Sequence, residues 1–364
     1  MCTGLLAGAL ACTATEKLTT AVRMKAAVDR LGADEAVSVT ARLEGTPEEV
    51  FAYLRQRTGA GTGERRLREQ ARLLSDLEVA LAVKADKPLR DLGRSDRVDT
   101  AAAVSFGGRD VLGVKSVNHK LYVRVGLAAL AAEVGHRGPV LRHVPELERL
   151  TDELPSSLHV AQSALRGDWV QVDSAAFGEF AEVLGGGADT PAERLARSTS
   201  VLTTAELQHQ LADAVRDTLT THGSVRADGE RDGAEHVTVT LPARAAGRTL
   251  ATALDPLRYY LGEPDLTPLT DAPDRPVRLD LAIRHGALSS LTVDLGRLDR
   301  HNPGGPDAAT LPLRLDFAPG EVAYVAAPSV AQLHPQDLLA ALTFVTLREP
   351  ELSSLLHTLR TLDL

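Results

Sequence analysis

Apolar and polar residues alternate with a period of two over much of the chain. The clearest case runs from Leu77 to Lys84, where Leu, Val, Leu and Val take every second position. This alternation is typical of antiparallel strands with one buried and one solvated face. It predicts strands over residues 37–43, 77–84, 98–106, 110–117, 120–125, 167–173, 237–241, 277–284, 291–295 and 311–317.

Short turn sequences separate several of these strands. Gly107-Gly108 and Asn118-His119 each leave two residues between neighbouring strand patterns. Two-residue loops of this composition favour tight hairpins. The region from 98 to 125 is therefore predicted to be an antiparallel meander.

A second pattern, with apolar residues three or four positions apart, predicts helices between the strand runs. Thr46, followed by Pro47 and by Glu49, has the features of a helix N-terminus with a capping box. Leu18, Val22 and Val28 fall near one face of a helix over 15–31. Further helices are predicted at 126–134, from Thr190, from Thr203 to Gly223, at 249–257, at 335–346 and at 349–362.

Runs of strands, rather than strictly alternating strands and helices, predict the α+β class. We expect a strongly curved antiparallel sheet, or half-barrel, packed with helices. The strand at 38–43 and its following helix resemble the strand at 237–241 and the helix after it, which suggests a duplicated unit. The glycine-rich segment near Gly185 predicts a boundary between a first unit, 13–188, and a second unit, 189–364.

Composition and the absence of known motifs argue against several classes of function. The 364 residues have a formal net charge of −9, with scattered basic residues, which disfavours nucleic-acid binding. No G-x-S-x-G, H-E-x-x-H, Walker or S-x-x-K motif occurs, so we expect no enzyme and no cofactor. His136 and His143 form the closest histidine pair, but no third ligand has suitable spacing, so no metal site is expected.

The two cysteines, Cys2 and Cys12, both lie near the N-terminus. The nine residues Thr3 to Ala11 are uncharged and small or apolar, as in the core of a signal peptide. The run Ala9-Leu10-Ala11-Cys12 resembles the lipobox of bacterial lipoproteins, in which the cysteine is acylated and becomes the new N-terminus. No basic residue precedes the apolar run, so we infer a start codon further upstream; the alternative is an apolar helical N-terminus of a cytoplasmic protein.

Three strand segments stand out beside the lipobox-like Cys12: Asn118 to Val125 (NHKLYVRV), Gly167 to Asp173 (GDWVQVD) and Gly286 to Leu295 (GALSSLTVDL). Together they resemble exported actinobacterial lipoproteins of the LolA-like and LppX/LprG-like superfamily. The resemblance implies a bent antiparallel sheet covered by helices, with acyl chains often carried in its hollow. It also implies a protein anchored to the outer face of the cell membrane through its acyl group.

These patterns predict an exported, lipid-anchored protein that binds an apolar ligand, possibly lipid, between curved sheet and helices. The candidate pocket residues are Leu279, Leu281, Ile283, Leu291, Val293, Leu295, Leu313, Leu315 and Trp169. Trp169 is open to two interpretations, a ligand-stacking ring or a ring packed in the core. The alternative function is a surface interaction or sensor lipoprotein with a filled core, and the presence of a pocket distinguishes the two.

Overall fold

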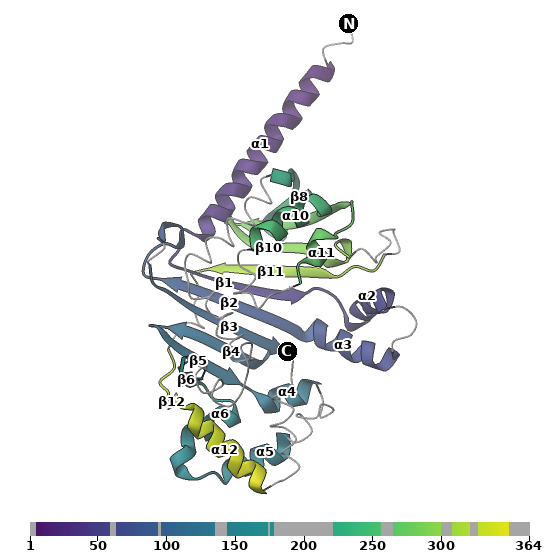
Figure 1. Ribbon diagram of the computed structural model, residues 1–364. Coiled ribbons are helices and arrows are strands. Elements are labelled where there is room, and N and C mark those ends of the chain that lie inside the picture. Colours follow the sequence, from purple (N-terminus) through teal and green to yellow (C-terminus); the bar gives the residue numbers. More distant parts are fainter. Residues whose placement is uncertain are drawn as a thin grey trace.

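The computed structural model describes residues 5–58, 63–93, 96–134, 144–173, 175–177, 221–255, 265–299, 308–320 and 327–348. Its strands form one open sheet in the order β12-β6-β5-β4-β3-β2-β1-β11-β10-β9-β8-β7 (Figure 1). The strands are β1 (Ala36–Leu43), β2 (Leu77–Ala85), β3 (Val98–Phe106), β4 (Arg109–Val117), β5 (Lys120–Val125), β6 (Val170–Val172), β7 (Ser224–Arg231), β8 (Ala234–Pro242), β9 (Pro276–Arg284), β10 (Ala287–Asp294), β11 (Pro312–Pro319) and β12 (Gln332–Leu333). All neighbours are antiparallel except β12 and β6. The predicted α+β class with an antiparallel sheet is confirmed.

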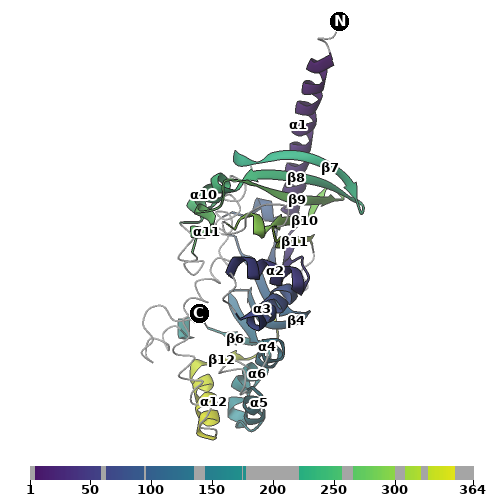
Figure 2. The same ribbon diagram turned by 90° about the vertical axis from the view of Figure 1, so that its right-hand side faces the viewer.

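Helices lie at both ends of this sheet and, as α2 and α3, beside its central strands (Figure 1). They are α1 (Leu5–Leu31), α2 (Pro47–Thr58), α3 (Glu64–Asp76), α4 (Leu127–Val134), α5 (Val144–Asp152), α6 (His159–Arg166), α10 (Ala243–Leu254), α11 (Thr267–Thr270) and α12 (Pro335–Arg348). Helix α1 lies near the β7–β11 end and projects away from the body, whereas α5, α6 and α12 lie at the opposite end (Figures 1 and 2). The predicted helices from Thr190, from Thr203 and over 349–362 lie outside the described residues, apart from the short helical stretch at 221–222.

The predicted turns are present. Gly107 and Gly108 have φ of 53° and 79°, and Asn118 and His119 have φ of 53° and 61°. Two successive residues with positive φ characterise the type I′ turn, whose twist matches that of the flanking strands. The hairpins β3–β4 and β4–β5 are thus confirmed.

The capping box before α2 is also confirmed. The backbone N–H of Thr46 donates to a carboxylate oxygen of Glu49 at 2.7 Å, and the backbone N–H of Glu49 donates to the hydroxyl of Thr46 at 3.3 Å. Two backbone donors that a helix N-terminus leaves unpaired are thereby satisfied. This cap fixes where the chain leaves β1.

The connectivity repeats in the two halves of the chain. Strands β1 and β2 are neighbours joined through α2 and α3, and two further strands, β3 and β4, follow in order. Strands β8 and β9 are neighbours joined through α10 and α11, and β10 and β11 follow in the same way. The expected duplication is visible in this order of elements.

The two repeated halves share one continuous sheet. Strand β1 pairs with β11 over seven residue pairs, from Val37 with Pro319 to Leu43 with Leu313. Without this pairing, each of the two strands would be a sheet edge with unpaired backbone groups, so joining them removes two edges at once. The boundary between 13–188 and 189–364 lies outside the described residues and stays a prediction.

One face of the sheet is apolar from end to end, and we call it the apolar face. Residues paired across antiparallel strands lie on the same face. A single row therefore crosses nine strands, through Val237, Leu281, Leu291, Leu315, Ala41, Val79, Val104, Leu112 and Val125. At about 4.8 Å per strand, this row is about 38 Å wide.

The opposite face, which we call the polar face, carries the alternate residues. The corresponding row contains Thr238, Asp280, Thr292, Arg314, Arg42, Glu78, Ser105 and Asp110. Ion pairs link some of them, as between Arg42 and Asp316 at 3.2 Å and between Arg314 and Glu44 at 3.0 Å. The predicted split into one apolar and one wet face is therefore confirmed for the strands of the second half. Over β2–β5 the polar face instead carries a buried cluster of Ala82, Ala101, Val117 and Tyr122.

Helix α1 differs from its prediction in extent and in contact face. It begins at Leu5 instead of residue 15. Leu18 and Val22 are 69% and 66% exposed, whereas Met24 and Ala27 pack against the apolar face. The positions of the large apolar residues predicted the wrong contact face of this helix. The helix packs instead through a face that includes the small Ala27, which allows it to approach the sheet closely.

One helix start and two whole elements also differ from expectation. Helix α10 begins at Ala243, six residues before the predicted start. Strand β7 was not predicted, because its charged residues hide the alternation. Helix α3 was not predicted as a helix either, although Leu67 and Ala71 form its buried side.

We expect Leu281→Ala to lower the free energy of unfolding by about 2–5 kcal/mol, the usual cost of removing a buried leucine. Leu281 is 3% exposed and packs with Val237 and Val239. Arg278→Ala, on the exposed side of the same strand, should change it by less than about 0.5 kcal/mol. Urea denaturation of both variants measures the difference, and equal losses would contradict the assigned faces.

Candidate functional site

The register brings most of the predicted pocket residues together. Leu281, Leu291 and Leu315 form one row on the apolar face, and Leu279, Val293 and Leu313 form the next. Ile283 lies on the same face because it is two positions after Leu281 on β9. Its partners on the neighbouring strands are Leu288 and Glu235. Seven of the nine predicted residues therefore lie on one surface.

Three of these seven are core residues. Leu279, Leu281 and Ile283 are each less than 10% exposed and pack in a cluster with Ala27 of α1 and Ala246 of α10. Their side chains are covered by helices on this part of the sheet. They stabilise the fold by burial and leave little surface for a ligand.

The other four lie nearer the middle of the sheet and are less covered. Leu291, Val293, Leu313 and Leu315 are all half-buried. On the same face, β2 presents Leu81 with 38% of its surface exposed. Val125 of β5, on the same face, is 37% exposed, whereas Leu43 of β1 packs with the cluster of α2 and α3 around Val50 and Ala71. The described part of the apolar face is therefore incompletely covered at several positions between its two ends.

Helices at the far end cover a different part of the apolar face. Val170 of β6 packs with Leu333 and with Ala341 of α12. Of the predicted covering residues in α12, Leu338 joins this cluster and Leu339 is 37% exposed. The predicted covering stripe Leu207, Leu211, Val215 and Leu219 lies outside the described residues.

Leu295 does not lie in the strand row. Strand β10 ends at Asp294, whose carboxylate accepts hydrogen bonds from the backbone N–H groups of Gly296 and Leu311 at 2.9 and 2.8 Å. This cap starts a short 3-10 helix, η5 (Leu295–Arg297). Leu295 then packs with residues of α2 and α3, including Val50 and Ala71.

Trp169 lies on the polar face, away from the leucines. Its ring edge is so close to Gly113 that a Cβ on this glycine would be 2.6 Å from Cη2 of the indole. Gly113 pairs with Ala103 and Arg124 on the polar face. The predicted single pocket containing both Trp169 and the leucines is therefore wrong, because the sheet separates them.

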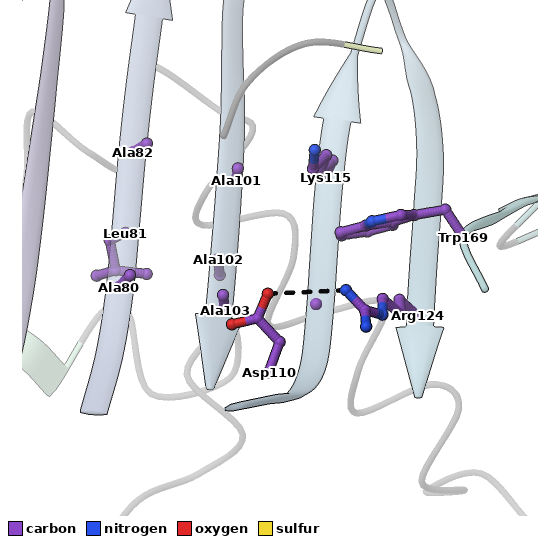
Figure 3. Close-up of a pocket in the computed structure, with 11 residues that line it drawn as sticks. Ala80, Leu81, Ala82, Ala101, Ala102, Ala103, Asp110, Lys115, Arg124 and Trp169 are labelled. Atoms are coloured by element: carbon purple, nitrogen blue, oxygen red, sulfur yellow. Dashed lines mark ion pairs between the residues drawn. The ribbon is translucent and has the colours of Figure 1, made fainter. Parts of the chain in front are cut away.

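Trp169 forms one wall of a small hollow on the polar face (Figure 3). Small residues on three adjacent strands form most of its floor: Ala80, Ala82, Ala101, Ala103 and Gly113. Leu81 and Ala102 also line the hollow. Lys115 and Arg124 lie on either side of the indole, and Asp110 lies 3.7 Å from Arg124 (Figure 3). Arg124 also donates from Nε to the carbonyl of Gly167 at 2.9 Å.

The Lys115 ammonium lies over the indole, 4.6 Å from the ring centroid. This is a cation–π arrangement. Burial lowers the pKa of Lys115 below its ordinary value of 10.5, and the charge of Arg124 lowers this pKa further, while Asp110 opposes the shift. The polar face thus places a partly desolvated cation beside an apolar floor.

The predicted lipidation residue, Cys12, falls inside α1. The N-terminal part of this helix stands clear of the body of the protein (Figure 1). No helix within the described ranges is long and apolar enough to cross a membrane. Those ranges also contain no group of three or more side chains suited to a metal ion.

No protein-family model matches the chain, and no curated protein sequence matches it. Among solved structures, it is similar to the crystal structure of the Mycobacterium tuberculosis lipoprotein LppX. The sequence identity is 9% and the TM-score is 0.32, with 84% of this chain and 97% of that chain covered.

Because burial lowers the pKa of Lys115, we expect the emission of Trp169, the single tryptophan, to titrate with a midpoint below 10.5. Loss of the charge above the ring removes the cation–π contact. In the unfolded chain Lys115 is not buried, so its pKa there is the higher one. Between the two pKa values the unfolded state binds more protons than the folded state, so Lys115 makes the free energy of unfolding rise with pH in that range.

The same fluorescence titration is carried out on Lys115→Met, which should lack the transition caused by Lys115. Tyrosine ionisation also alters emission at high pH, but it occurs in the native protein and in the variant alike. Lys84→Met removes an exposed lysine on the same face and should keep the transition. Superimposable fluorescence titrations of the native protein and Lys115→Met would contradict the assignment.

Proposed function

We propose that this chain is an exported, lipid-anchored protein that binds an apolar ligand, such as an acyl chain, against the middle of the apolar face. One observation carries the proposal: an unbroken apolar row crosses nine strands, and its middle is only half-buried. The candidate binding residues are Leu291, Val293, Leu313 and Leu315, together with Leu81.

Geometry supports this assignment. A helix with its side chains is about 10–12 Å across, whereas the apolar row spans about 38 Å. The clusters around Ala27 and around Val170 occupy the two ends of the face. The strands between them present apolar side chains without charged neighbours on the same face.

The energetics favour a long apolar ligand. Each methylene group transferred from water to an apolar surface contributes about 0.8 kcal/mol, so a chain of many methylenes binds without a specific polar contact. Side chains of leucine and valine offer no hydrogen bonds that would select a polar substrate. The absence of catalytic motifs in the sequence agrees with a binding role.

The anchor is the second part of the proposal. Cleavage before Cys12 and its acylation would leave the rest of α1 directly after the lipid, since Cys12 lies within this helix and fewer than two turns separate it from the exposed Leu18. Helix α1 then connects the membrane to the sheet, with its C-terminal half packed on the apolar face. The protein would lie on the outer side of the cell membrane.

We expect lipid to be recovered in stoichiometric amount when the purified protein is extracted with organic solvent. Leu81→Arg should remove it, because it places a charge where the apolar ligand lies, at a position that is already 38% exposed and so tolerates a longer side chain. Thr292→Arg, on the polar face, is the control and should retain lipid.

Mass spectrometry of the extracts gives the lipid-to-protein ratio. Absence of lipid from the native protein, together with failure to bind added fatty acid, would reject ligand binding and favour a surface interaction protein. Equal lipid content in Leu81→Arg and Thr292→Arg would move the ligand away from this face.

Cys12→Ser should move the protein from the membrane fraction to the soluble fraction in a bacterial host, since a serine hydroxyl cannot take the thioether link of the anchor. Cys2→Ser is the matched control and should leave the protein on the membrane. Immunoblots of the two fractions measure this, and a membrane-bound Cys12→Ser protein would contradict the assigned anchor.

A further inference from the structure

Helix α1 carries two large apolar side chains on the side that faces away from the sheet. Leu18 and Val22 are 69% and 66% exposed. They lie one turn apart, opposite the buried Thr20 and Ala27 on the helix circumference. Lys25 and Asp29 continue the same side of the helix, and we call Leu18, Val22, Lys25 and Asp29 the outer stripe.

The exposure of these two side chains is unusual for this protein. Among the large apolar residues that the structure describes, only Leu347 of α12 is more exposed. A helix position that faces water needs no apolar side chain, because polar residues form helices equally well there. Adjacent apolar side chains on such a surface therefore point to a partner surface that covers them.

The proposed anchor would place the outer stripe beside the membrane. Leu18 is six residues after Cys12, about 9 Å along the helix, and Val22 is about 15 Å along it. A helix that lies on a membrane surface sinks its apolar side about 5–10 Å into the boundary between headgroups and acyl chains. The N-terminal part of α1 stands clear of the sheet, so the body of the protein leaves room for this contact (Figures 1 and 2).

The charge of α1 differs in sign from that of the whole protein. After Cys12 the helix sequence contains four basic and two acidic residues, whereas the chain has a formal net charge of −9. Lys25 has 76% of its side chain exposed, and its ion pair with Asp29 is also exposed and therefore weak. A lysine beside an apolar patch can reach lipid phosphates with its ammonium group. These charges favour an anionic lipid surface as the partner.

A second copy of α1 fits the outer stripe less well. Helices that pair as a coiled coil repeat apolar residues at two positions of each heptad over three or more heptads. Lys25 and Asp29 occupy the positions that would continue such a seam, and Ala14 and Thr15 precede it. Two large apolar residues are too few for a stable helix pair, but they suffice to orient a helix that is already held at a membrane.

We propose that the outer stripe of α1 lies in the interface of an anionic bilayer, with Leu18 and Val22 between the lipid headgroups and the upper acyl chains. Its place beside the membrane rests on the proposed anchor at Cys12, whereas the contact itself needs no acyl group. Because α1 packs on the apolar face, this contact turns the apolar face of β8–β10 toward the membrane. A ligand that leaves the bilayer then reaches Leu291 and Val293 without crossing the sheet.

The test uses the full-length chain with Cys2→Ser and Cys12→Ser, so that no acyl group contributes and each labelled variant has one thiol. The environment-sensitive dye NBD is attached at Val22→Cys, at Val28→Cys on a lateral side of α1, or at Leu347→Cys on α12. Vesicles that contain phosphatidylglycerol are added at millimolar lipid. We expect a blue shift and quenching by nitroxide-labelled lipid at position 22, weaker quenching at position 28 and none at position 347.

Flotation of the unlabelled protein with the same vesicles identifies the residues that make the contact. Leu18→Ser and Val22→Ser should each weaken binding about tenfold, the factor that burial of one such side chain supplies. Val28→Ser is the matched control, since it makes the same change on the same helix outside the outer stripe, at a residue that is 40% exposed. It should bind normally. Vesicles of phosphatidylcholine alone should bind more weakly, because they lack the anionic charge.

Two outcomes overturn the proposal. Equal quenching at positions 22 and 28, or equal binding of Val22→Ser and Val28→Ser, would assign the binding to residues 3–11, which all variants share. A blue shift at position 22 that grows with protein concentration in the absence of lipid would assign the outer stripe to a second copy of the chain.

The anchor is decided separately by the fractionation of Cys12→Ser, because two side chains hold the protein too weakly to keep it on a membrane during fractionation. A released Cys12→Ser protein whose label at position 22 is not quenched keeps the anchor and rejects the membrane contact of α1. A retained Cys12→Ser protein whose label is quenched more strongly at position 22 than at position 28 rejects the anchor and supports the membrane contact.

Discussion

Backbone pairing between β1 and β11 is the interaction on which the rest of the structure depends. It joins strands more than 260 residues apart and places Ala41 opposite Leu315 and Leu43 opposite Leu313. Because side chains alternate between faces, a shift of this register by one residue would put the apolar residues of one half on the polar face of the other. The observed register is therefore what makes two repeated halves into one sheet with one apolar and one polar face.

Most of the strands were predictable because the alternation that defines them is local. Hairpins at Gly107-Gly108 and Asn118-His119, and the cap at Thr46, follow from residue types that only a few backbone conformations favour. The joining of the two halves was not predictable in this way. Pairing of β1 with β11 depends on which sheet edges remain open after each half has folded, and no short sequence pattern records that.

The candidate site shows the same division. Alternation correctly grouped Leu281, Leu291 and Leu315, but it could not show that α1 covers Leu281 while Leu315 is left half-buried. Trp169 was assigned to the wrong face, although a signal was present: Val170 and Val172 occupy the apolar face, so the residue one position before Val170 points the other way. The alanines beside it, at 80, 82, 101 and 103, also follow this period, and their size becomes informative only once β2 and β3 are known to be neighbours.

Photo-crosslinking tests most directly whether the middle of the apolar face contacts an acyl chain. A fatty acid with a diazirine on its chain would be bound, irradiated and mapped by mass spectrometry of the digested protein. We predict labels on β11, β1 and β2, at Leu315, Val39 and Leu81 or their neighbours on that face, and none on the buried cluster around Val237. Labels confined to α1 or to the polar face, or no labelling at saturating probe, would contradict the account.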